Sequence, residues 1–264
     1  MRWALLRRQT PLSLRTFVAP HAVARRGASA AAEDREPVPV RSLSPDSYLN
    51  KILNSRVYDV AKETELQYAP VLSQSGNEVY FKREDQQPVF SFKIRGAYNK
   101  IASLTEEELK NGIIACSAGN HAQGVALSAA KLQVDNVIIM PKGTPNIKVD
   151  AVKKFGGNVV LHGDNYDEAE AEAMRLVEAE GRTLIHPFDD PDVIAGQGTV
   201  GMEILRQCSG REDKLTAIFC CVGGGGLLAG VLAYVKHVRP ETFHEYYGNY
   251  YFFDRKTLFN VQCV

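Results

Sequence analysis

Residues 112–140, GIIACSAGNHAQGVALSAAKLQVDNVIIM, hold the pattern that decides the fold. Two short apolar runs, 112–116 and 136–140, are predicted strands, and the helix-forming residues 122–131 lie between them. The alternation continues through predicted strands at 158–161 and 183–185, and through predicted helices that begin at Thr144 and Pro145 and that cover 167–180. Because parallel strands joined by helices form a sheet covered on both faces, the pattern predicts an α/β fold.

Further predicted elements flank this block. Upstream, residues 78–82 predict a strand, and a helix is expected from Lys93 through Ile101. Thr105 and Glu108 have the spacing of a capping box for a short further helix. Downstream, the predicted elements are a helix at 198–208, a strand at 216–222 and a helix at 227–235.

Composition limits the classes of protein to consider. The chain has 264 residues, of which 45% are hydrophobic and 23% charged, enough for one large domain or two modest ones. The formal net charge is zero and no basic block lies beyond the N-terminal region, so no nucleic-acid partner is indicated. The five cysteines lack metal-ligand spacing, so we expect no metal site and buried thiols in a reducing compartment: Cys116, Cys208, Cys220, Cys221 and Cys263.

The N-terminal region is basic. It carries six arginines before its first acidic residue, Glu33: Arg2, Arg7, Arg8, Arg15, Arg25 and Arg26. We expect residues 1–36 to be an organelle transit peptide, with the mitochondrion as first choice and the plastid as second, and a disordered basic tail is the alternative. Arginines and prolines interrupt its apolar runs, so neither a secretory signal nor a membrane span is predicted.

A lysine between apolar neighbours lies at the start of one predicted helix, in Ser91-Phe92-Lys93-Ile94-Arg95-Gly96-Ala97-Tyr98. A lysine amine is mostly protonated at neutral pH, so it must be desolvated or covalently held before it can do covalent chemistry. Phe90, Phe92 and Ile94 are candidates for a dry environment around Lys93. The alternative is a surface lysine at the start of an amphipathic helix.

A glycine run follows the predicted strand 216–222 and opens an apolar helix, in Gly223-Gly224-Gly225-Gly226-Leu227. Glycines let the backbone approach a ligand closely, and the amides at a helix N-terminus favour an anion. The run therefore predicts a phosphate-binding loop, with a flexible linker as the alternative. It lacks the lysine of a nucleotide P-loop and the spacing of a dinucleotide fingerprint, which favours a smaller phosphorylated cofactor.

A third motif lies at the carboxyl end of the predicted strand 112–116, in Ser117-Ala118-Gly119-Asn120-His121-Ala122-Gln123-Gly124. Open α/β sheets bind ligands at this end, and the amides at a helix start can hold a carboxylate. Asn120 offers a directional hydrogen bond or, alternatively, caps the helix. His121 alone fits a structural histidine, and neither His162 nor His186 is assigned a role.

The three motifs together supply a lysine in an apolar setting, a phosphate loop and an anion-binding turn, which are the parts that pyridoxal phosphate requires. They resemble, in order and separation, the three signatures of the threonine dehydratase (threonine ammonia-lyase) family. That family has the two-domain tryptophan-synthase-β-like fold of pyridoxal-phosphate enzymes, fold type II. The resemblance covers about residues 42–240.

The resemblance implies a role for each motif residue. Lys93 is expected to bind pyridoxal phosphate covalently and, once the substrate amine has displaced it, to take the α-proton. Phe92 is expected to pack on the cofactor ring and Asn120 to bond the ring hydroxyl oxygen. The phosphate is expected on the loop formed by Gly223, Gly224, Gly225, Gly226 and Leu227. The substrate carboxylate is expected on the amides of Ser117, Ala118, Gly119, Asn120 and His121.

The implied reaction is the deamination of L-threonine to 2-oxobutanoate and ammonia, the first step of isoleucine biosynthesis, with L-serine, which gives pyruvate, as a second substrate. The implied partners are the amino-acid substrate and, in the full-length form, further copies of the chain; no nucleic acid or membrane is implied. A serine racemase is a weaker alternative. Ala118 stands where racemases carry a serine, and an alanine has no proton to give to the face opposite Lys93.

The resemblance also divides the chain. Residues 37–109 and 190–240 are expected to form an incomplete large cofactor-binding domain, and residues 110–189 a small domain. Residues 241–264 depart from the family pattern and form an aromatic-rich tail with neither strand nor helix periodicity. Without further strands the large sheet would have an open edge, so we expect a poor enzyme. A truncated, non-catalytic product that at most binds cofactor or a full-length partner is the alternative to an active one.

Overall fold

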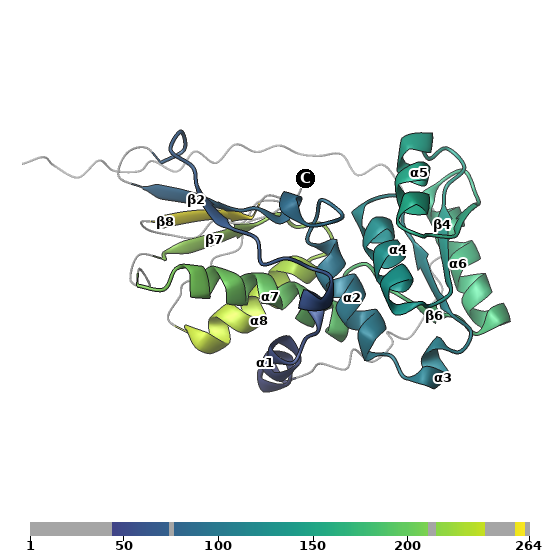
Figure 1. Cartoon of the computed structure of the whole chain (residues 1–264), viewed down its shortest axis with the longest axis horizontal. Helices are drawn as coiled ribbons and strands as arrows, with labels where there is room; N and C mark the ends of the chain where they lie inside the picture. The colour runs from purple at the N-terminus through teal and green to yellow at the C-terminus, as the bar shows by residue number, and fades with distance from the viewer. Residues whose placement is uncertain (1–43, 74–76, 211–214, 241–256, 262–264) are drawn as a thin grey trace, which may run out of the picture. The chain divides into compact units, whose positions relative to one another are not determined.

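The helices and strands are defined in a computed structural model that describes residues 44–73, 77–210, 215–240 and 257–261 (Figure 1). The predicted transit peptide, the tail aromatics at 243–253 and Cys263 lie outside these ranges. The helices are α1 (Pro45–Leu53), α2 (Lys93–Ser103), α3 (Glu106–Leu109), α4 (Asn120–Leu132), α5 (Asn146–Lys154), α6 (Tyr166–Glu180), α7 (Pro191–Gln207) and α8 (Gly226–Val238), with 3-10 turns η1 (Val57–Asp59) and η2 (Glu84–Gln86). The strands are β1 (Leu66–Tyr68), β2 (Glu78–Lys82), β3 (Ile113–Cys116), β4 (Asn136–Met140), β5 (Val159–Leu161), β6 (Thr183–Leu184), β7 (Ala217–Cys220) and β8 (Thr257–Val261).

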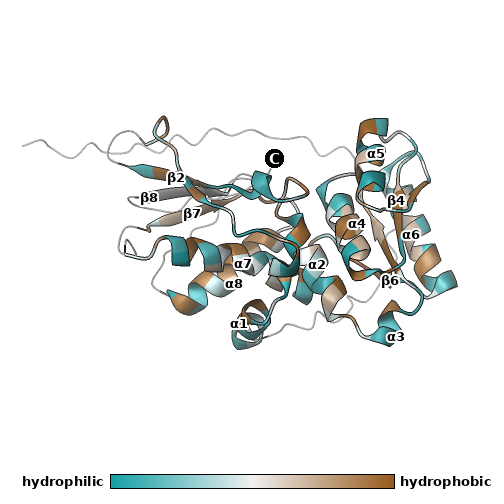
Figure 2. Ribbon diagram, viewed as in Figure 1, coloured by the Kyte–Doolittle hydropathy of each residue, from teal (hydrophilic) through white to brown (hydrophobic). Residues whose placement is uncertain are grey.

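The predicted parallel sheet is confirmed, with strand order β5-β4-β3-β6. Successive residues of a strand point to opposite faces. Ile113 and Ala115 of β3 accordingly join a core cluster with residues of α4 and α5, whereas Ile114 and Cys116 join another with Ala169 of α6. Figure 2 shows hydrophobic residues, brown, along β4 and on parts of α4 and α6. Burial on both faces explains why these strands are apolar throughout.

The second sheet has the order β1-β2-β8-β7. β1 is antiparallel to β2, whereas β8 is parallel to both of its neighbours. Its core joins α7 and α8 to β7 through residues such as Val200, Ile218 and Val231. Helix α2 contacts both α7 and α4, so it connects the elements around this sheet with those around the first (Figure 1).

Strand β8 shows that the expectation of no strand in residues 241–264 is wrong for part of the tail. Its five residues pair with β2 on one side and with β7 on the other. The strands that pair with it lie far away in the sequence, so tertiary pairing rather than a local alternation of polar and apolar residues defines it. The lack of periodicity therefore does not exclude a strand, and the sheet has a strand where the sequence predicted an open edge.

Helix α7 begins seven residues before the predicted start, at Pro191 rather than Gly198. The Asp190 side chain caps it by accepting hydrogen bonds from the amides of Asp192 (2.8 Å) and Val193 (3.1 Å). The glycines in its first half weaken helix propensity but allow close packing, because a Cβ at Gly196 would lie 2.6 Å from the Arg95 carbonyl oxygen. Tertiary contact therefore decides where this helix begins.

Other local predictions have mixed outcomes. The capping box is confirmed, because the Thr105 hydroxyl accepts from the Glu108 amide while the Glu108 carboxylate accepts from the Thr105 amide. Cys116, Cys208 and Cys220 are buried, and burial raises the pKa of Cys116 to about 11. The expectation that all the cysteines are buried is wrong for Cys221, which is exposed just after β7. Among the described residues, no helix has the length and apolarity needed to span a membrane.

Candidate active site

Lys93 is the first residue of α2, and Phe92 precedes it as the N-cap. Its backbone amide donates to the Ser91 hydroxyl (3.2 Å), which satisfies one of the free amides of the helix start. Its Nζ donates to the Pro187 carbonyl oxygen at 2.6 Å. The side chain is half-buried and directed at the chain that follows β6, which excludes the alternative of a lysine pointing freely into solvent.

The environment of the amine differs in part from the prediction. The Phe92 ring centroid lies 5.4 Å from Nζ, so this ring does flank the amine. Phe90 does not, because it is 67% exposed on a turn with a φ of 58°. Ile94 is fully buried in a separate cluster with Val57 and Val89. The dry environment predicted for the amine is therefore seen at Phe92, whereas Phe90 is exposed and Ile94 packs in another cluster.

The second motif forms the turn between β3 and α4. Gly119 is the N-cap of α4 and makes no side-chain capping bond, so Asn120 is the first helical residue and the alternative of an Asn120 cap is wrong. The Ser117 hydroxyl accepts from the Gly119 amide at 3.2 Å. A Cβ on Gly119 would meet no protein atom within 4 Å, so the backbone here borders open space. A helix start of this kind favours an anion, although the Ser117 amide already donates to the Ile139 carbonyl oxygen (3.2 Å) and the Gly119 amide to Ser117.

His121 is buried and its ring position is fixed. Its Nε2 lies 2.8 Å from the Ile185 carbonyl oxygen, which can only accept, so Nε2 carries the proton. Burial lowers the pKa of His121 to about 3, so the ring is neutral at physiological pH. Its Nδ1 is buried and has no hydrogen-bond partner among the residues that the structure describes. The structural interpretation of this histidine fits its contacts.

Gly124, at the end of the second motif, brings that motif against the first. A Cβ at this position would lie 3.2 Å from the backbone carbon and oxygen of Lys93. The glycine therefore allows α4 to approach the first turn of α2 closely. The first and second motifs, which are separated in the sequence, are thus in direct contact.

The glycine run forms the turn between β7 and α8. Gly225 is the N-cap, with a φ of 85° that favours glycine, and α8 begins at Gly226. Among the described residues, none lies within 4 Å of a Cβ placed on Gly223 or Gly225, whereas a Cβ on Gly224 would overlap the Phe188 ring. Leu227 is buried and anchors the helix behind the loop. The loop thus packs on protein on one side and borders open space on the other.

Residues 185–188 connect all three motifs. The Ile185 carbonyl accepts from His121, the Pro187 carbonyl accepts from Lys93, and Phe188 packs against the glycine run. The His186 Nδ1 accepts from the amide of Asp189 (2.8 Å), which shapes this turn. No motif in the sequence marks this segment. The one signal of its role is its position at the carboxyl end of a predicted parallel strand.

These residues fit pyridoxal phosphate. The cofactor carries an aldehyde and a phosphate, and the site supplies a half-buried primary amine and the N-terminal amides of α8 beside open space. The amides of α4 provide a second place for an anion. No group of histidine, cysteine and acidic side chains suited to a metal ion occurs in the described part of the chain.

Comparison with known proteins agrees with this fit. A profile of the family described as "Pyridoxal-phosphate dependent enzyme" matches residues 57–246, and the chain belongs to that family. It is 62% identical over 195 residues to threonine dehydratase 1 of Solanum lycopersicum, described as biosynthetic and chloroplastic (74% of this chain, 32% of the relative). It is 58% identical over 208 residues to the mitochondrial threonine dehydratase of Schizosaccharomyces pombe (77% and 34%). The chain spans about a third of the length of these relatives.

Solved structures give the same result. The processed form of threonine deaminase isoform 2 from Solanum lycopersicum aligns with a TM-score of 0.72 and 52% identity, over 75% of this chain and 54% of that one. Maize serine racemase aligns with a TM-score of 0.69 and 32% identity, over 75% and 58%. The predicted fold class and family are therefore confirmed.

Proposed function

We propose that this chain carries the cofactor site of a threonine ammonia-lyase, which deaminates L-threonine, and L-serine as a second substrate, and serves isoleucine biosynthesis. The observation that carries the proposal is that residues 185–188 contact all three motifs: Pro187 bonds the Lys93 amine, Ile185 bonds His121, and Phe188 packs on Gly224 and Gly226. The similarity to threonine dehydratases of a plant and a yeast supports this substrate class.

In this proposal the chain's own residues bind and orient. Lys93 holds the cofactor and later takes the substrate α-proton, Phe92 flanks the ring, and Asn120 bonds the ring hydroxyl. Residues 223–226 bind the phosphate, and Leu227 keeps the N-terminus of α8 in place. The cofactor supplies the electron sink that makes loss of the α-proton and of the β-hydroxyl accessible.

The substrate carboxylate is assigned to the α4 turn. Residues 117–121 lead from β3 into α4, which begins at Asn120, and the helix dipole favours negative charge at that start. The Pro187 carbonyl accepts a hydrogen bond from the Lys93 amine (2.6 Å) and so orients it. A neutral His121 adds no competing positive charge beside that lysine.

Three further proposals concern the domains, the localisation and the oligomeric state. The sheet β5-β4-β3-β6 belongs to the small domain (110–189), and the other sheet to the large domain (37–109 and 190–240). Relatives are described as mitochondrial and as chloroplastic, and we propose the mitochondrion for this chain on its basic N-terminal sequence, with the plastid second. The full-length form is proposed to be a homo-oligomer.

Reduction with borohydride in the presence of pyridoxal phosphate, followed by peptide mapping, tests the site. We expect the label on Lys93 and its loss in Lys93→Ala, whereas Lys154→Ala, which changes an exposed lysine of α5, keeps it. A label on another lysine would contradict the assignment.

Product analysis tests the reaction. Release of 2-oxobutanoate from L-threonine supports the lyase, whereas cofactor binding without release supports the non-catalytic alternative. Substantial D-serine from L-serine would favour a racemase despite Ala118.

A further inference from the structure

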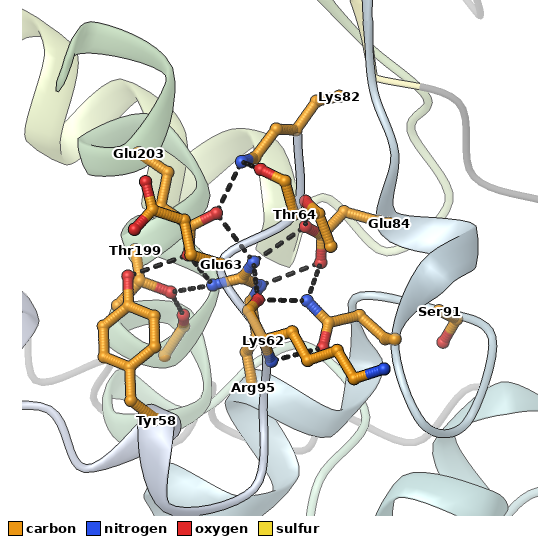
Figure 3. Close-up of polar contacts among 12 residues, drawn as sticks. Tyr58, Lys62, Glu63, Thr64, Lys82, Glu84, Ser91, Arg95, Thr199 and Glu203 are labelled. Carbon is orange, nitrogen blue, oxygen red and sulfur yellow. Dashed lines mark hydrogen bonds and ion pairs between the residues drawn. The ribbon is translucent and has the colours of Figure 1, made fainter. Parts of the chain in front are cut away.

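Four charged side chains lie buried behind the first turn of α2: Lys82, Glu84, Arg95 and Glu203. We call them the Arg95 cluster. Each residue is at most 1% exposed, and the cations and carboxylates balance in charge. Figure 3 shows the Arg95 guanidinium between the two carboxylates. The proposed chemistry uses none of these side chains directly.

Arg95 is fully bonded. Its Nε and Nη2 donate to the Glu84 carboxylate (2.8 and 2.7 Å), and its Nη1 and Nη2 donate to the Glu203 carboxylate (2.6 and 3.0 Å). Nη1 also donates to the Thr199 hydroxyl (3.0 Å), and Nη2 to the Lys62 carbonyl (3.1 Å). Paired bonds of this kind fix the plane of the guanidinium as well as its position.

The rest of the cluster is bonded as completely. The Lys82 amine lies 2.5 Å from Glu203 Oε2 and donates to the Thr64 carbonyl (2.5 Å) and to Gln207 (3.0 Å). Tyr58 donates its hydroxyl to Glu203 (2.8 Å). Burial alone would raise the pKa of Glu203, but the charges of Arg95 and Lys82 outweigh it and hold that pKa below its usual value. The carboxylate therefore remains charged.

The Arg95 cluster contacts α2 on the side opposite the Lys93 amine. Residues two apart on a helix point roughly 200° apart, so Arg95 and Lys93 leave the first turn in opposite directions. Their contacts agree, since Lys93 reaches Pro187 while Arg95 reaches Glu203 on α7. A rotation or a shift of α2 would break the Arg95 bonds and displace the Lys93 amine together.

Two glycines lie at the contact between the two helices. The side chains of Val193 and Gln197 of α7 pack on Gly96 of α2, where a Cβ would lie 2.8 Å from Val193 Cγ1, and Gly196 of α7 meets the backbone of α2. The glycines allow close approach, and the packing of side chains on Gly96 is a non-directional contact. The bonds of Arg95 to Thr199 and Glu203 add the directional contacts that fix the register.

Stability alone does not account for the cluster, because apolar replacements of buried ion pairs are often equally stable. We propose that the Arg95 cluster is a positioning device that fixes the rotation and register of α2 against α7 and so holds the Lys93 amine at the site. The inference rests on the proposed role of Lys93.

Three variants test it. Arg95→Lys keeps the charge but cannot form the paired bonds. Thr199→Val keeps shape and charge but removes the bond from Arg95 and the hydroxyl's own bond to the Gly196 carbonyl (2.7 Å). Val152→Ala is the matched control, because it removes buried side-chain atoms from α5, which contributes nothing to the cluster. Thermal unfolding of each variant and of the wild-type protein is measured first, and a temperature is then chosen at which all of them have the same folded fraction.

Two readouts follow Lys93. The first is the rate at which pyridoxal phosphate attaches to Lys93, measured by stopping the reaction with borohydride at successive times. The second needs no cofactor: reductive methylation by formaldehyde of Lys93 relative to the exposed Lys154, measured by mass spectrometry. A purely structural role moves neither readout once the folded fraction is matched.

We expect Arg95→Lys to slow attachment by about 100-fold, the cost of a displacement of roughly 1 Å. Thr199→Val should slow it by about fivefold, and both should change the methylation ratio, whereas Val152→Ala should change neither. Wild-type rates and ratios in Arg95→Lys overturn the proposal, and if that variant does not fold, Thr199→Val decides. If the wild-type protein attaches the cofactor elsewhere, the proposed function fails, but the methylation ratio still decides the positioning role.

Discussion

Gly223 and Gly224 are neighbours with different surroundings. A Cβ on Gly224 would overlap the Phe188 ring, whereas one on Gly223 would meet no protein atom within 4 Å. An alanine at 224 would therefore disturb the loop itself. An alanine at 223 would meet none of the described residues, so its effect tests the phosphate assigned to this loop.

Gly223→Ala should leave the unfolding temperature unchanged and weaken the binding of pyridoxal phosphate by at least about tenfold, because it interferes with a hydrogen bond to a charged group. Gly143→Ala is the control, since Gly143 also borders open space and lies outside the site loop. Equilibrium dialysis measures the affinity. Equal affinity in both variants would show that the phosphate does not approach Gly223.

His121 makes stability depend on pH. Burial lowers its pKa to about 3 from 6.5, so between these pH values the unfolded chain binds a proton that the folded chain does not. Stability should therefore be fully present above pH 6.5 and fall as the pH decreases toward 3, with a slope of up to about 1.4 kcal/mol per pH unit from this residue.

Urea unfolding at a series of pH values tests this prediction. The quantity to compare between variants is the slope of the unfolding free energy against pH, not its absolute value. His121→Gln should lose that contribution, whereas His162→Gln, at an exposed position, should keep it. Burial also lowers the pKa of His186, but that contribution is common to all three proteins and cancels in the comparison. An unchanged slope in His121→Gln would mean that the ring is not buried as a neutral group.

At the scale of elements, the crossing of α2 and α7 reverses the usual effect of a helical glycine. Replacing glycine by alanine within a helix normally stabilises it by about 1 kcal/mol. At Gly196, however, a Cβ would lie 2.6 Å from the Arg95 carbonyl oxygen and 2.7 Å from the Gly96 Cα, so the helices would have to separate. Gly196→Ala should therefore destabilise the chain.

Overpacking of this kind costs typically 1–3 kcal/mol, so we expect about that loss in urea unfolding. Gly201→Ala is the comparison, because its nearest contacts to α8 would be 3.1 and 3.2 Å, which a small adjustment relieves. Gly201→Ala should therefore lower the free energy of unfolding by clearly less than Gly196→Ala. A stabilised Gly196→Ala protein would show that α2 and α7 do not approach as closely as described.

Elements with a strong local signal were predictable. Strands β2 and β4 have the predicted bounds, because their apolar runs end at turn residues. The start of α7 was not predictable, since close packing at Gly196 overrides its weak propensity. Likewise the site motifs could be found, but their junction at Pro187 and the Arg95 cluster depend on residues brought together only by the fold. Nothing local in Lys82 or Glu203 marks them as buried.

At the scale of the whole molecule, the C-terminal tail bears on whether the large sheet forms. The sequence led us to expect an open edge and a poor enzyme, but β8 lies between β2 and β7. In the described part of the sheet, no other strand connects those two. The tail therefore contributes backbone pairing to the sheet that precedes the glycine loop.

Removal of residues 241–264 should lower the unfolding temperature and speed amide hydrogen exchange in β2 and β7, because each lost backbone bond contributes about 1 kcal/mol net. β3 and β4 lie in the other sheet and serve as an internal reference. A point variant refines the test: Asn260→Pro removes an amide donor from a strand paired on both sides, whereas Asn260→Thr keeps it. Exchange in β2 and β7 should increase in the proline variant alone. If the shortened chain melts and exchanges like the full one, β8 does not hold the sheet together, and the original expectation of an open edge stands.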